Sequence, residues 1–137
     1  MMTRVWERLN IGSLKDAEQL GSANPMGITD ILSLCPEEVL HRADNISYAS
    51  IPIADACPIS ARQFEAVIAA IAAHIRKGTV LLNCAAGMSR SPILAAAWMH
   101  RCGYLNFEAA LQEIADLRPT IDPSPVLLRS VKENLIR

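Results

Sequence analysis

The chain has 137 residues, of which 51% are hydrophobic and 20% charged, a composition typical of a single globular domain, here expected to span 1–137. With 13 Lys and Arg against 14 Asp and Glu, the formal net charge of −1 argues against an electrostatic partner such as nucleic acid. The longest apolar runs, Val67–Ala73 and Ile93–Met99, are far shorter than the roughly 18 residues of a membrane span, and the first residues do not resemble a signal peptide, so we expect a cytoplasmic protein without a membrane partner.

Short strands are predicted in the N-terminal half. Val5–Ile11 holds short apolar runs broken by charge, followed by a glycine, which indicates a hairpin at the edge of a sheet. Ile28–Leu34 and Ile46–Ile51 are β-prone runs, each ended by a proline that follows closely. Glu37–Ala43, which lies between them, is expected to form one or two helical turns.

A longer amphipathic helix is predicted next. Ser60 and Gln63 have the spacing of a capping box, and apolar residues then recur at helical intervals until Gly78 ends the pattern. Thr79–Leu82 follows as a short apolar strand, of the kind that lies buried in a parallel sheet.

Three further helices are predicted in the C-terminal half. Ser91 and Pro92 open the first, and its Ile93–Met99 run is apolar on all sides, which indicates a central, buried helix. Asn106 caps the second helix and Ser124 the third. Strands that alternate with helices, followed by helices alone, predict an α/β fold: a central, mostly parallel sheet of about four to five strands flanked by helices, with a helical C-terminal half.

The loop between the Thr79–Leu82 strand and the Ser91 helix carries the candidate chemistry. A loop that leads from a parallel strand into a helix N-terminus binds anions, because free backbone N–H groups converge there and the helix dipole favours negative charge. Cys84 opens the loop and Arg90 closes it, with five residues between them. The expected phosphate-binding residues are those of the loop: Ala85, Ala86, Gly87, Met88, Ser89 and Arg90.

Cys84 and Arg90 are predicted to act together on a bound phosphate. Helix N-termini and nearby cations favour the thiolate form of cysteine, which is the nucleophile. The guanidinium of Arg90 suits bidentate contact with phosphate oxygens, and a thiolate beneath the phosphate is placed for in-line attack on phosphorus. Ser91 is expected to donate a hydrogen bond to the sulfur and so ease its departure.

An isolated match to this spacing arises by chance in many chains, and a cysteine at a strand end is often a small buried apolar residue. The preceding strand, the internal glycine and the proline-opened helix favour the functional interpretation of Cys84. The other cysteines, Cys35, Cys57 and Cys102, are expected to be packing residues. Neither the cysteines nor the histidines have metal-ligand spacing, so no metal and no cofactor is expected.

The Ala85–Ser91 run resembles the signature of the cysteine-dependent protein phosphatases, and most of all that of their dual-specificity branch. The likeness extends to Leu9–Ser13, to Gly27–Leu34 and to Arg118–Pro123, so it spans nearly the whole chain. It implies a protein tyrosine phosphatase-like fold and a reaction that passes through a phosphocysteine intermediate.

The resemblance also implies a general acid that protonates the leaving oxygen, and Asp55 is the candidate. Asp55 follows a predicted strand, and the loops at the carboxyl ends of parallel strands converge on one edge of the sheet. The same carboxylate is expected to act later as the base that activates water. A solvated turn residue is the alternative for Asp55, while Asp116 and Asp122 are poorer candidates because they lie beside the C-terminal helices.

One departure from the family pattern immediately precedes the cysteine. The family usually carries histidine there, whereas this chain carries Asn83. An amide can hydrogen-bond to the nearby backbone but cannot be cationic. We therefore expect a less stabilised thiolate or a differently held loop, without loss of the reaction.

The predicted function is hydrolysis of phosphomonoesters on phosphotyrosine proteins, extending to phosphoserine and phosphothreonine proteins, by a monomer. Because no Lys or Arg lies between Cys84 and Arg90, a single phosphate group is favoured as substrate. One alternative is a phosphatase for RNA 5′ ends, phosphoinositides or a small phosphorylated metabolite. The others are a phosphate-binding pseudophosphatase and rhodanese-like sulfur transfer.

Overall fold

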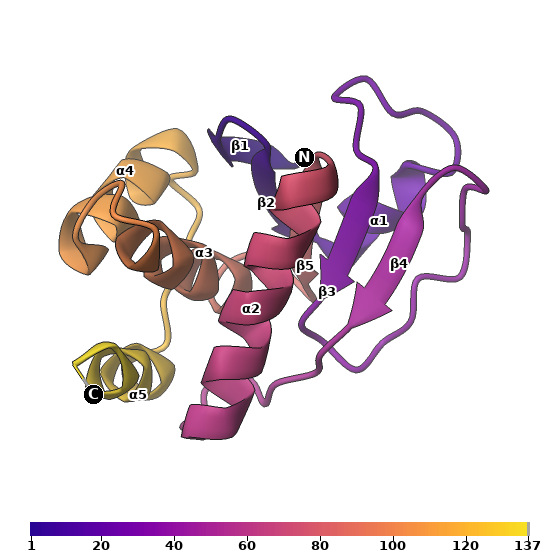
Figure 1. The fold of residues 1–137 in the computed structure, drawn as a ribbon. Coiled ribbons are helices and arrows are strands. Elements are labelled where there is room, and N and C mark those ends of the chain that lie inside the picture. The colour runs from indigo at the N-terminus through magenta and orange to yellow at the C-terminus, as the bar shows by residue number, and fades with distance from the viewer. Residues whose placement is uncertain (137) are drawn as a thin grey trace.

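The computed structural model describes residues 1–136, which form a five-stranded sheet flanked by helices (Figure 1). The strands are β1 (Thr3–Trp6), β2 (Leu9–Ser13), β3 (Asp30–Ser33), β4 (Ser47–Ser50) and β5 (Val80–Cys84). The helices are α1 (Leu14–Gln19), α2 (Ala61–Lys77), α3 (Arg90–Arg101), α4 (Phe107–Leu117) and α5 (Pro125–Leu135). The sheet order is β1-β2-β5-β3-β4, and its neighbouring strands are parallel except for the antiparallel pair β1 and β2. The predicted α/β fold with a mostly parallel sheet is therefore confirmed.

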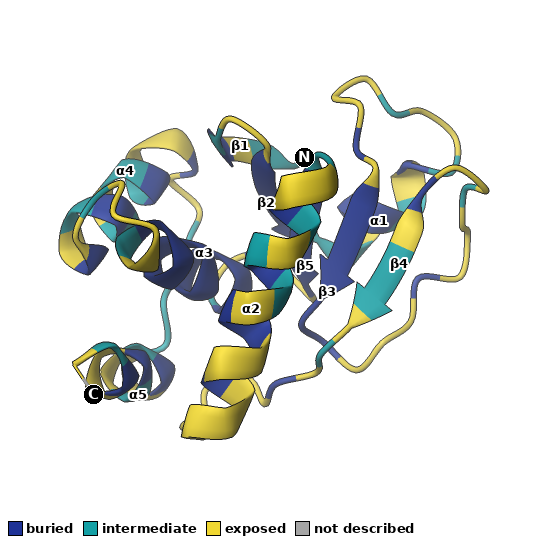
Figure 2. Ribbon diagram, viewed as in Figure 1, coloured by how far each residue is buried: buried dark blue, intermediate teal, exposed yellow. Residues whose placement is uncertain are grey.

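The side chains of the central strand β5 alternate between two cores, one on each face of the sheet. Val80 and Leu82 belong to the larger core, which α2 and α3 cover, whereas Leu81 belongs to a smaller core beside α1. All of β5 is buried, which explains its unbroken apolar run, since a strand covered on both faces needs apolar side chains on both. Helix α3 is buried along Ile93–Met99, as predicted, and Figure 2 shows β3 and α3 among the buried elements.

Four helices begin at a residue whose side chain caps them. Ser13, Ser60, Asn106 and Ser124 each accept a hydrogen bond from the backbone N–H three residues later, a contact that stabilises a helix by about 1 kcal/mol. Helix α3 differs, because its N-cap residue Ser89 makes no such bond and leaves the first N–H groups open. No helix within residues 1–136 is both long and apolar enough to cross a membrane.

The helical turns predicted for Glu37–Ala43 are absent, and that prediction is wrong. The backbone N–H groups of Leu40 and His41 donate instead to the two carboxylate oxygens of Glu18, which lies on α1. Donors that a side chain of another element has taken cannot form the backbone bonds of a helix.

Two features near the N-terminus also differ from the sequence-based prediction. The hairpin lies at the edge only through β1, because β2 pairs on its other side with β5 and is an interior strand. Helix α1 was not predicted at all. It has six residues, too few for a helical repeat, and only the capping box of Ser13 and Asp16 marks it in the sequence.

Candidate active site

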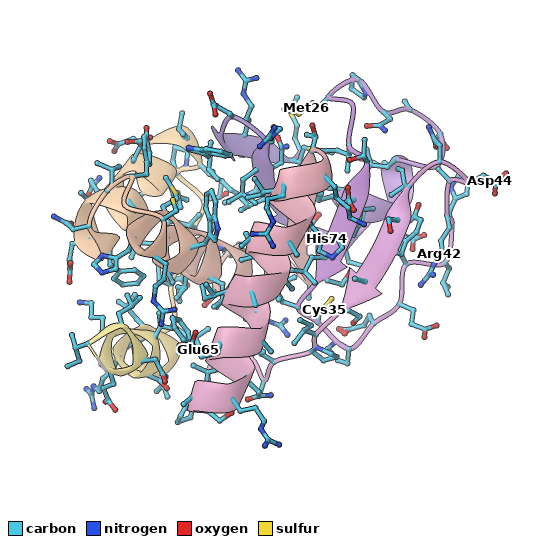
Figure 3. All side chains as sticks on the ribbon, in the orientation of Figure 1. Met26, Cys35, Arg42, Asp44, Glu65 and His74 are labelled. Atoms are coloured by element: carbon cyan, nitrogen blue, oxygen red, sulfur yellow. The ribbon has the colours of Figure 1, made fainter. Side chains whose placement is uncertain are left out.

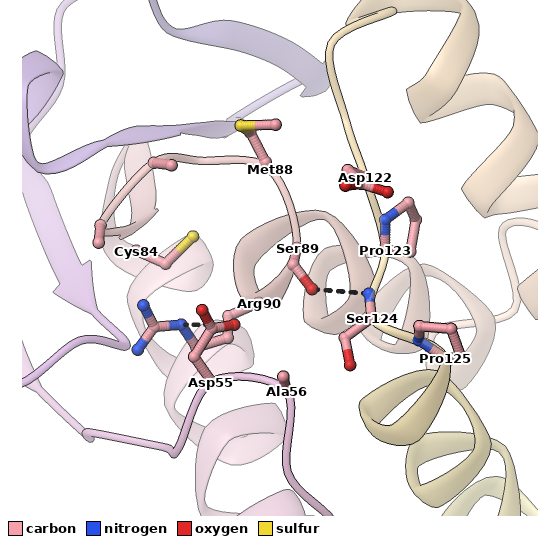
Figure 4. A pocket seen from close by; sticks show the side chains of 12 residues that line it. Asp55, Ala56, Cys84, Met88, Ser89, Arg90, Asp122, Pro123, Ser124 and Pro125 are labelled. Carbon is pink, nitrogen blue, oxygen red and sulfur yellow. Dashed lines mark hydrogen bonds and ion pairs between the residues drawn. The ribbon is translucent and has the colours of Figure 1, made fainter.

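A pocket of about 410 Å³ opens at the carboxyl end of β5, where the chain turns into α3 (Figure 4). Three segments line it: the loop within 84–90, residues 55–56 in the loop after β4, and residues 122–125, which lead into α5. The pocket therefore brings the predicted phosphate loop together with Asp55, which precedes Cys84 by 29 positions in the sequence.

Cys84 is the last residue of β5, and it lines the pocket although it is only 2% exposed. Its Sγ lies 3.2 Å from Oγ of Ser91, a fully buried residue in the first turn of α3. A hydroxyl has one proton to give, so Ser91 can donate it to a thiolate at Cys84.

The loop after Cys84 is fastened from outside through its backbone carbonyls. Each of three carbonyl oxygens accepts a hydrogen bond from a neighbouring element: Ala85 from the N–H of Leu14 at 3.1 Å, Gly87 from Nε of Arg118 at 3.0 Å, and Met88 from the N–H of Asp122 at 2.8 Å. Arg118 is itself 9% exposed, and its Nη1 donates to the Met1 carbonyl and to Oγ1 of Thr3. The guanidinium of Arg118 thus ties the loop to the start of the chain.

The opposite edges of the same peptide units turn toward the pocket. A trans peptide directs its N–H away from the preceding carbonyl, so the N–H groups of Ala86, Met88 and Ser89 point away from the partners that hold the loop. Together with the open N–H groups at the start of α3, they form a cup of donors with a positive potential. Such a cup suits an oxyanion.

Glycine is required at the back of this loop. Gly87 has a φ of +70°, a region that residues with a side chain rarely adopt. A Cβ atom there would also lie 2.6 Å from the backbone carbon of Gly12 and 2.8 Å from Nη2 of Arg118. Gly87 therefore lets the loop pack tightly against β2 and Arg118, while its neighbours face the pocket.

Arg90 and Asp55 lie next to each other in the lining of the pocket. Arg90, the first residue of α3, is 6% exposed, and its Nη1 donates to the Ile53 carbonyl at 3.2 Å. Its Nε lies 3.8 Å from Oδ1 of Asp55, whose side chain is 63% exposed. The next residue, Ala56, has a φ of +53°, which is strained for a residue with a side chain, and such strain concentrates at functional sites.

Asp122 also lines the pocket. The sequence predicted its position beside the C-terminal helices but not that it reaches the pocket as well. The segment before α5 is joined to the loop twice, through the Asp122–Met88 bond and through the N–H of Ser124, which donates to Oγ of Ser89 at 2.9 Å. The signal for this contact was present in Arg118–Pro123, a segment that resembles the family outside the loop.

Asn83, which directly precedes Cys84 in β5, lies next to Cys35. Asn83 is fully buried, and its Oδ1 accepts a hydrogen bond from Oγ of Ser33 at 2.8 Å while its Nδ2 lies 4.0 Å from Sγ of Cys35. Cys35 lies just beyond β3 (Figure 3), and burial, with the nearby charge of Glu37, raises the pKa of its thiol. Cys35 is a packing residue as predicted, but Cys57 and Cys102 are exposed, so the same prediction is wrong for those two.

Comparison with known sequences identifies relatives along most of the chain. The family profile described as "Dual specificity phosphatase, catalytic domain" matches residues 10–135. Dual specificity protein phosphatase 15 of Homo sapiens is 29% identical over 129 residues, which cover 91% of this chain and 43% of that protein. Dual specificity protein phosphatase 22-A of Danio rerio is 28% identical over 127 residues, which cover 90% of this chain and 60% of that protein. The chain thus spans about half the length of these curated relatives.

Solved structures show the same fold. The crystal structure of human DUSP28 superposes with a TM-score of 0.83 at 25% identity, covering 98% of this chain and 95% of that chain. The crystal structure of DUSP15 superposes with a TM-score of 0.78 at 26% identity, covering 98% of this chain and 84% of that chain. The sheet and its flanking helices are therefore arranged here as in those proteins.

Proposed function

The chain belongs to the dual specificity phosphatase family, and we propose that it hydrolyses phosphomonoesters on proteins through a phosphocysteine intermediate. The observation that carries the proposal is that Cys84, Arg90 and Asp55 line one pocket, together with a loop whose carbonyls are bonded to neighbouring elements. We expect the protein to act as a monomer in the cytoplasm, with a phosphorylated protein as its partner.

In the first step the Cys84 thiolate attacks phosphorus. A sulfur–phosphorus bond forms while the bond from phosphorus to the ester oxygen breaks, and that oxygen takes the electron pair. Asp55, protonated at the start, gives its proton to the leaving oxygen, so that an alcohol or phenol departs rather than an alkoxide or phenoxide. The exposed position of Asp55 at the pocket supports this role, because the leaving group must be free to leave.

In the second step water hydrolyses the phosphocysteine. The Asp55 carboxylate left by the first step takes a proton from water as its oxygen attacks phosphorus. The sulfur–phosphorus bond then breaks, and the sulfur leaves with the electron pair. The Ser91 hydroxyl, 3.2 Å from Sγ, donates a hydrogen bond to the departing thiolate, and inorganic phosphate is released.

The charge of the phosphoryl group is met by groups that are already in place. The loop N–H groups and the Arg90 guanidinium surround the equatorial oxygens in both steps, and donors held in advance need no rearrangement when charge builds up. Removal of one such donor typically costs an enzyme about 10²- to 10³-fold in rate. Because these groups neutralise the charge, we expect turnover to need no metal ion.

The pocket supports a protein substrate with one phosphate per site. Arg90 is the cation among the residues that line it within 1–136, so a lipid with several phosphates finds no further positive side chain there. We propose phosphotyrosine as the preferred phosphoresidue, with phosphoserine and phosphothreonine also accepted.

The test is a substrate panel in the presence of EDTA. Phosphate release is measured from a phosphotyrosine peptide, a phosphoserine peptide, a phosphoinositide in vesicles and a 5′-phosphorylated RNA. We expect the phosphotyrosine peptide to have the highest kcat/KM, and vanadate, which mimics phosphate, to inhibit. A higher kcat/KM on the lipid or the RNA would overturn the substrate proposal, and binding of every substrate without turnover would indicate a pseudophosphatase.

The intermediate is tested separately by acid quench with a radiolabelled phosphopeptide. We expect label on the wild-type protein and none on the Cys84→Ser variant. An unlabelled wild-type protein that nevertheless turns over would contradict the phosphocysteine mechanism.

A further inference from the structure

Among residues 1–136, four ionisable side chains line the pocket, and they differ in the contacts that they make. Arg90 and Cys84 are buried beneath the loop, and Arg90 lies beside Asp55. Asp122 is exposed, and within residues 1–136 its carboxylate has neither a hydrogen bond nor an ion pair. Asp122 is therefore the charged group of the pocket wall that is free to meet a substrate.

Asp122 is held at a fixed place relative to the loop. Its N–H donates to the Met88 carbonyl at 2.8 Å, and two residues later the N–H of Ser124 donates to Oγ of Ser89 at 2.9 Å. Pro123 between them has a fixed φ, which limits movement of the segment. Figure 4 shows Asp122 on the segment before α5 and Asp55 on a different segment of the wall.

Once a phosphate is bound, the positive groups of the pocket are engaged and negative charge remains on its wall. The phosphate engages Arg90 and the loop N–H groups, and Asp55 holds the proton that it later gives to the leaving oxygen, so the charged side chain that remains among the described lining residues is Asp122. A second anionic group on the substrate would meet the carboxylate of Asp122 there. A cationic group would meet the unpaired carboxylate of Asp122.

We propose that Asp122 is a specificity-determining residue, which favours phosphopeptides with Lys or Arg next to the phosphorylated residue and disfavours those with Asp, Glu or a second phosphate there. The inference rests on the proposed function, in that the loop holds the substrate phosphate. Exposed ion pairs contribute little each, so the expected preference for a cation over a neutral residue is roughly two- to fivefold. Repulsion of like charge widens the gap between cationic and anionic peptides.

The experiment measures binding separately from turnover. Three fluorescent phosphotyrosine peptides differ only in carrying Lys, Gln or Glu on both sides of the phosphotyrosine. Their Kd values are measured by fluorescence anisotropy in the Cys84→Ser background, and their kcat/KM values with the Cys84 protein. Each measurement is repeated with Asp122→Asn, which keeps the side-chain shape, and with Asp116→Asn as the matched control. Asp116 is an exposed aspartate on α4 that bonds Gln112 and does not line the pocket.

We expect the Lys peptide to bind about fivefold more tightly than the Glu peptide, and added salt to shrink that ratio. Asp122→Asn should bring the ratio close to one, while Asp116→Asn should retain it. Equal binding of the Lys and Glu peptides, or a ratio that Asp122→Asn leaves unchanged, overturns the inference. The expected order of binding without any turnover by the wild-type protein would uphold the inference and overturn the proposed function instead.

Discussion

Polar groups lie at both ends of the parallel strands, but at the amino end of β3 they contact one another, whereas at the carboxyl end of β5 they face a pocket. At the amino end of β3, Asp30 is 2% exposed, and its carboxylate accepts a hydrogen bond from Oγ1 of Thr29 at 2.7 Å. The same carboxylate lies 2.9 Å from Nδ1 of His74 and 3.2 Å from Nζ of Lys77. Figure 3 shows His74 on the side of α2 that faces β3. At the carboxyl end of β5, the loop N–H groups and Arg90 face a pocket instead.

The difference separates a structural network from a candidate site. Burial disfavours the charged form of Asp30, but hydrogen bonds from His74, Thr29 and Lys77 outweigh burial and hold the pKa of the carboxyl below its ordinary value of 3.8. The carboxylate of Asp30 has its partners within the protein, so the network stabilises the fold. At the other end the donors are aimed at a ligand. We therefore expect substitutions at the pocket to change the reaction and substitutions at Asp30 to change stability.

The largest expected effect is that of Cys84→Ser at the pocket. Removal of a nucleophile lowers kcat by at least about 10³-fold, because the serine hydroxyl is not ionised and cannot replace the thiolate. The exposed Cys102, whose Sγ donates to the Met99 carbonyl, provides the control Cys102→Ser, which should keep wild-type kcat. Phosphate release from p-nitrophenyl phosphate is the measurement. Turnover by Cys84→Ser comparable to that of the wild-type protein would contradict the assignment of the pocket as the active site.

The next effect is that of Asp55→Asn. Loss of the general acid should lower kcat for a phosphotyrosine peptide by about 10²-fold. The loss should be smaller for p-nitrophenyl phosphate, because its leaving group is stable without a proton. The exposed Asp44, in the loop before β4, supplies the control Asp44→Asn. Equal losses on both substrates would contradict the assignment of Asp55 as acid.

At the amino end of β3, Asp30→Asn should lower the free energy of unfolding by about 2 kcal/mol at neutral pH, because a neutral amide replaces the carboxylate that pairs with Lys77 and accepts from Thr29. The folded pKa of Asp30 is depressed, so its contribution is complete above the unfolded value near 3.8 and is lost as pH falls through the lower folded pKa. Urea unfolding of both proteins at several pH values should therefore show a difference that shrinks in acid. A kcat of the folded variant well below that of the wild-type protein would show that the two ends are not independent.

The smallest effect is expected for Arg118, which lies outside the loop in the sequence but contacts it in the structure. Arg118→Ala removes the donor to the Gly87 carbonyl, so the loop should hold phosphate less firmly, with about tenfold weaker inhibition by vanadate, the equivalent of about 1.4 kcal/mol. Arg76→Ala, at an exposed position on α2, is the control and should leave inhibition unchanged. The measurement is made where urea unfolding shows both variants folded. Unchanged inhibition in Arg118→Ala would mean that the loop keeps its shape without this contact.

The sequence predicted the elements whose signals are local. The cap at Ser60, the buried run of α3 and the turn from β5 into the loop each lie within a few neighbouring residues, and the structure has all three. The failures lie where contacts come from afar. Glu18 takes the backbone donors of the segment expected to be helical, and β2 is interior because it pairs with β5, about 70 residues further along the chain.

What the sequence determined by itself is the order of the five strands and of helices α2 to α5, together with the Cys84-to-Arg90 loop and its glycine, because these depend on the spacing of side chains along one stretch of chain. The tertiary structure alone decided which distant groups meet at that loop. Arg118 behind Gly87 and Asp122 on the pocket wall come from segments that only packing of the helices brings to the end of β5. Their hydrogen bonds fix the loop carbonyls outward, and that orientation is what turns the N–H groups toward a bound anion.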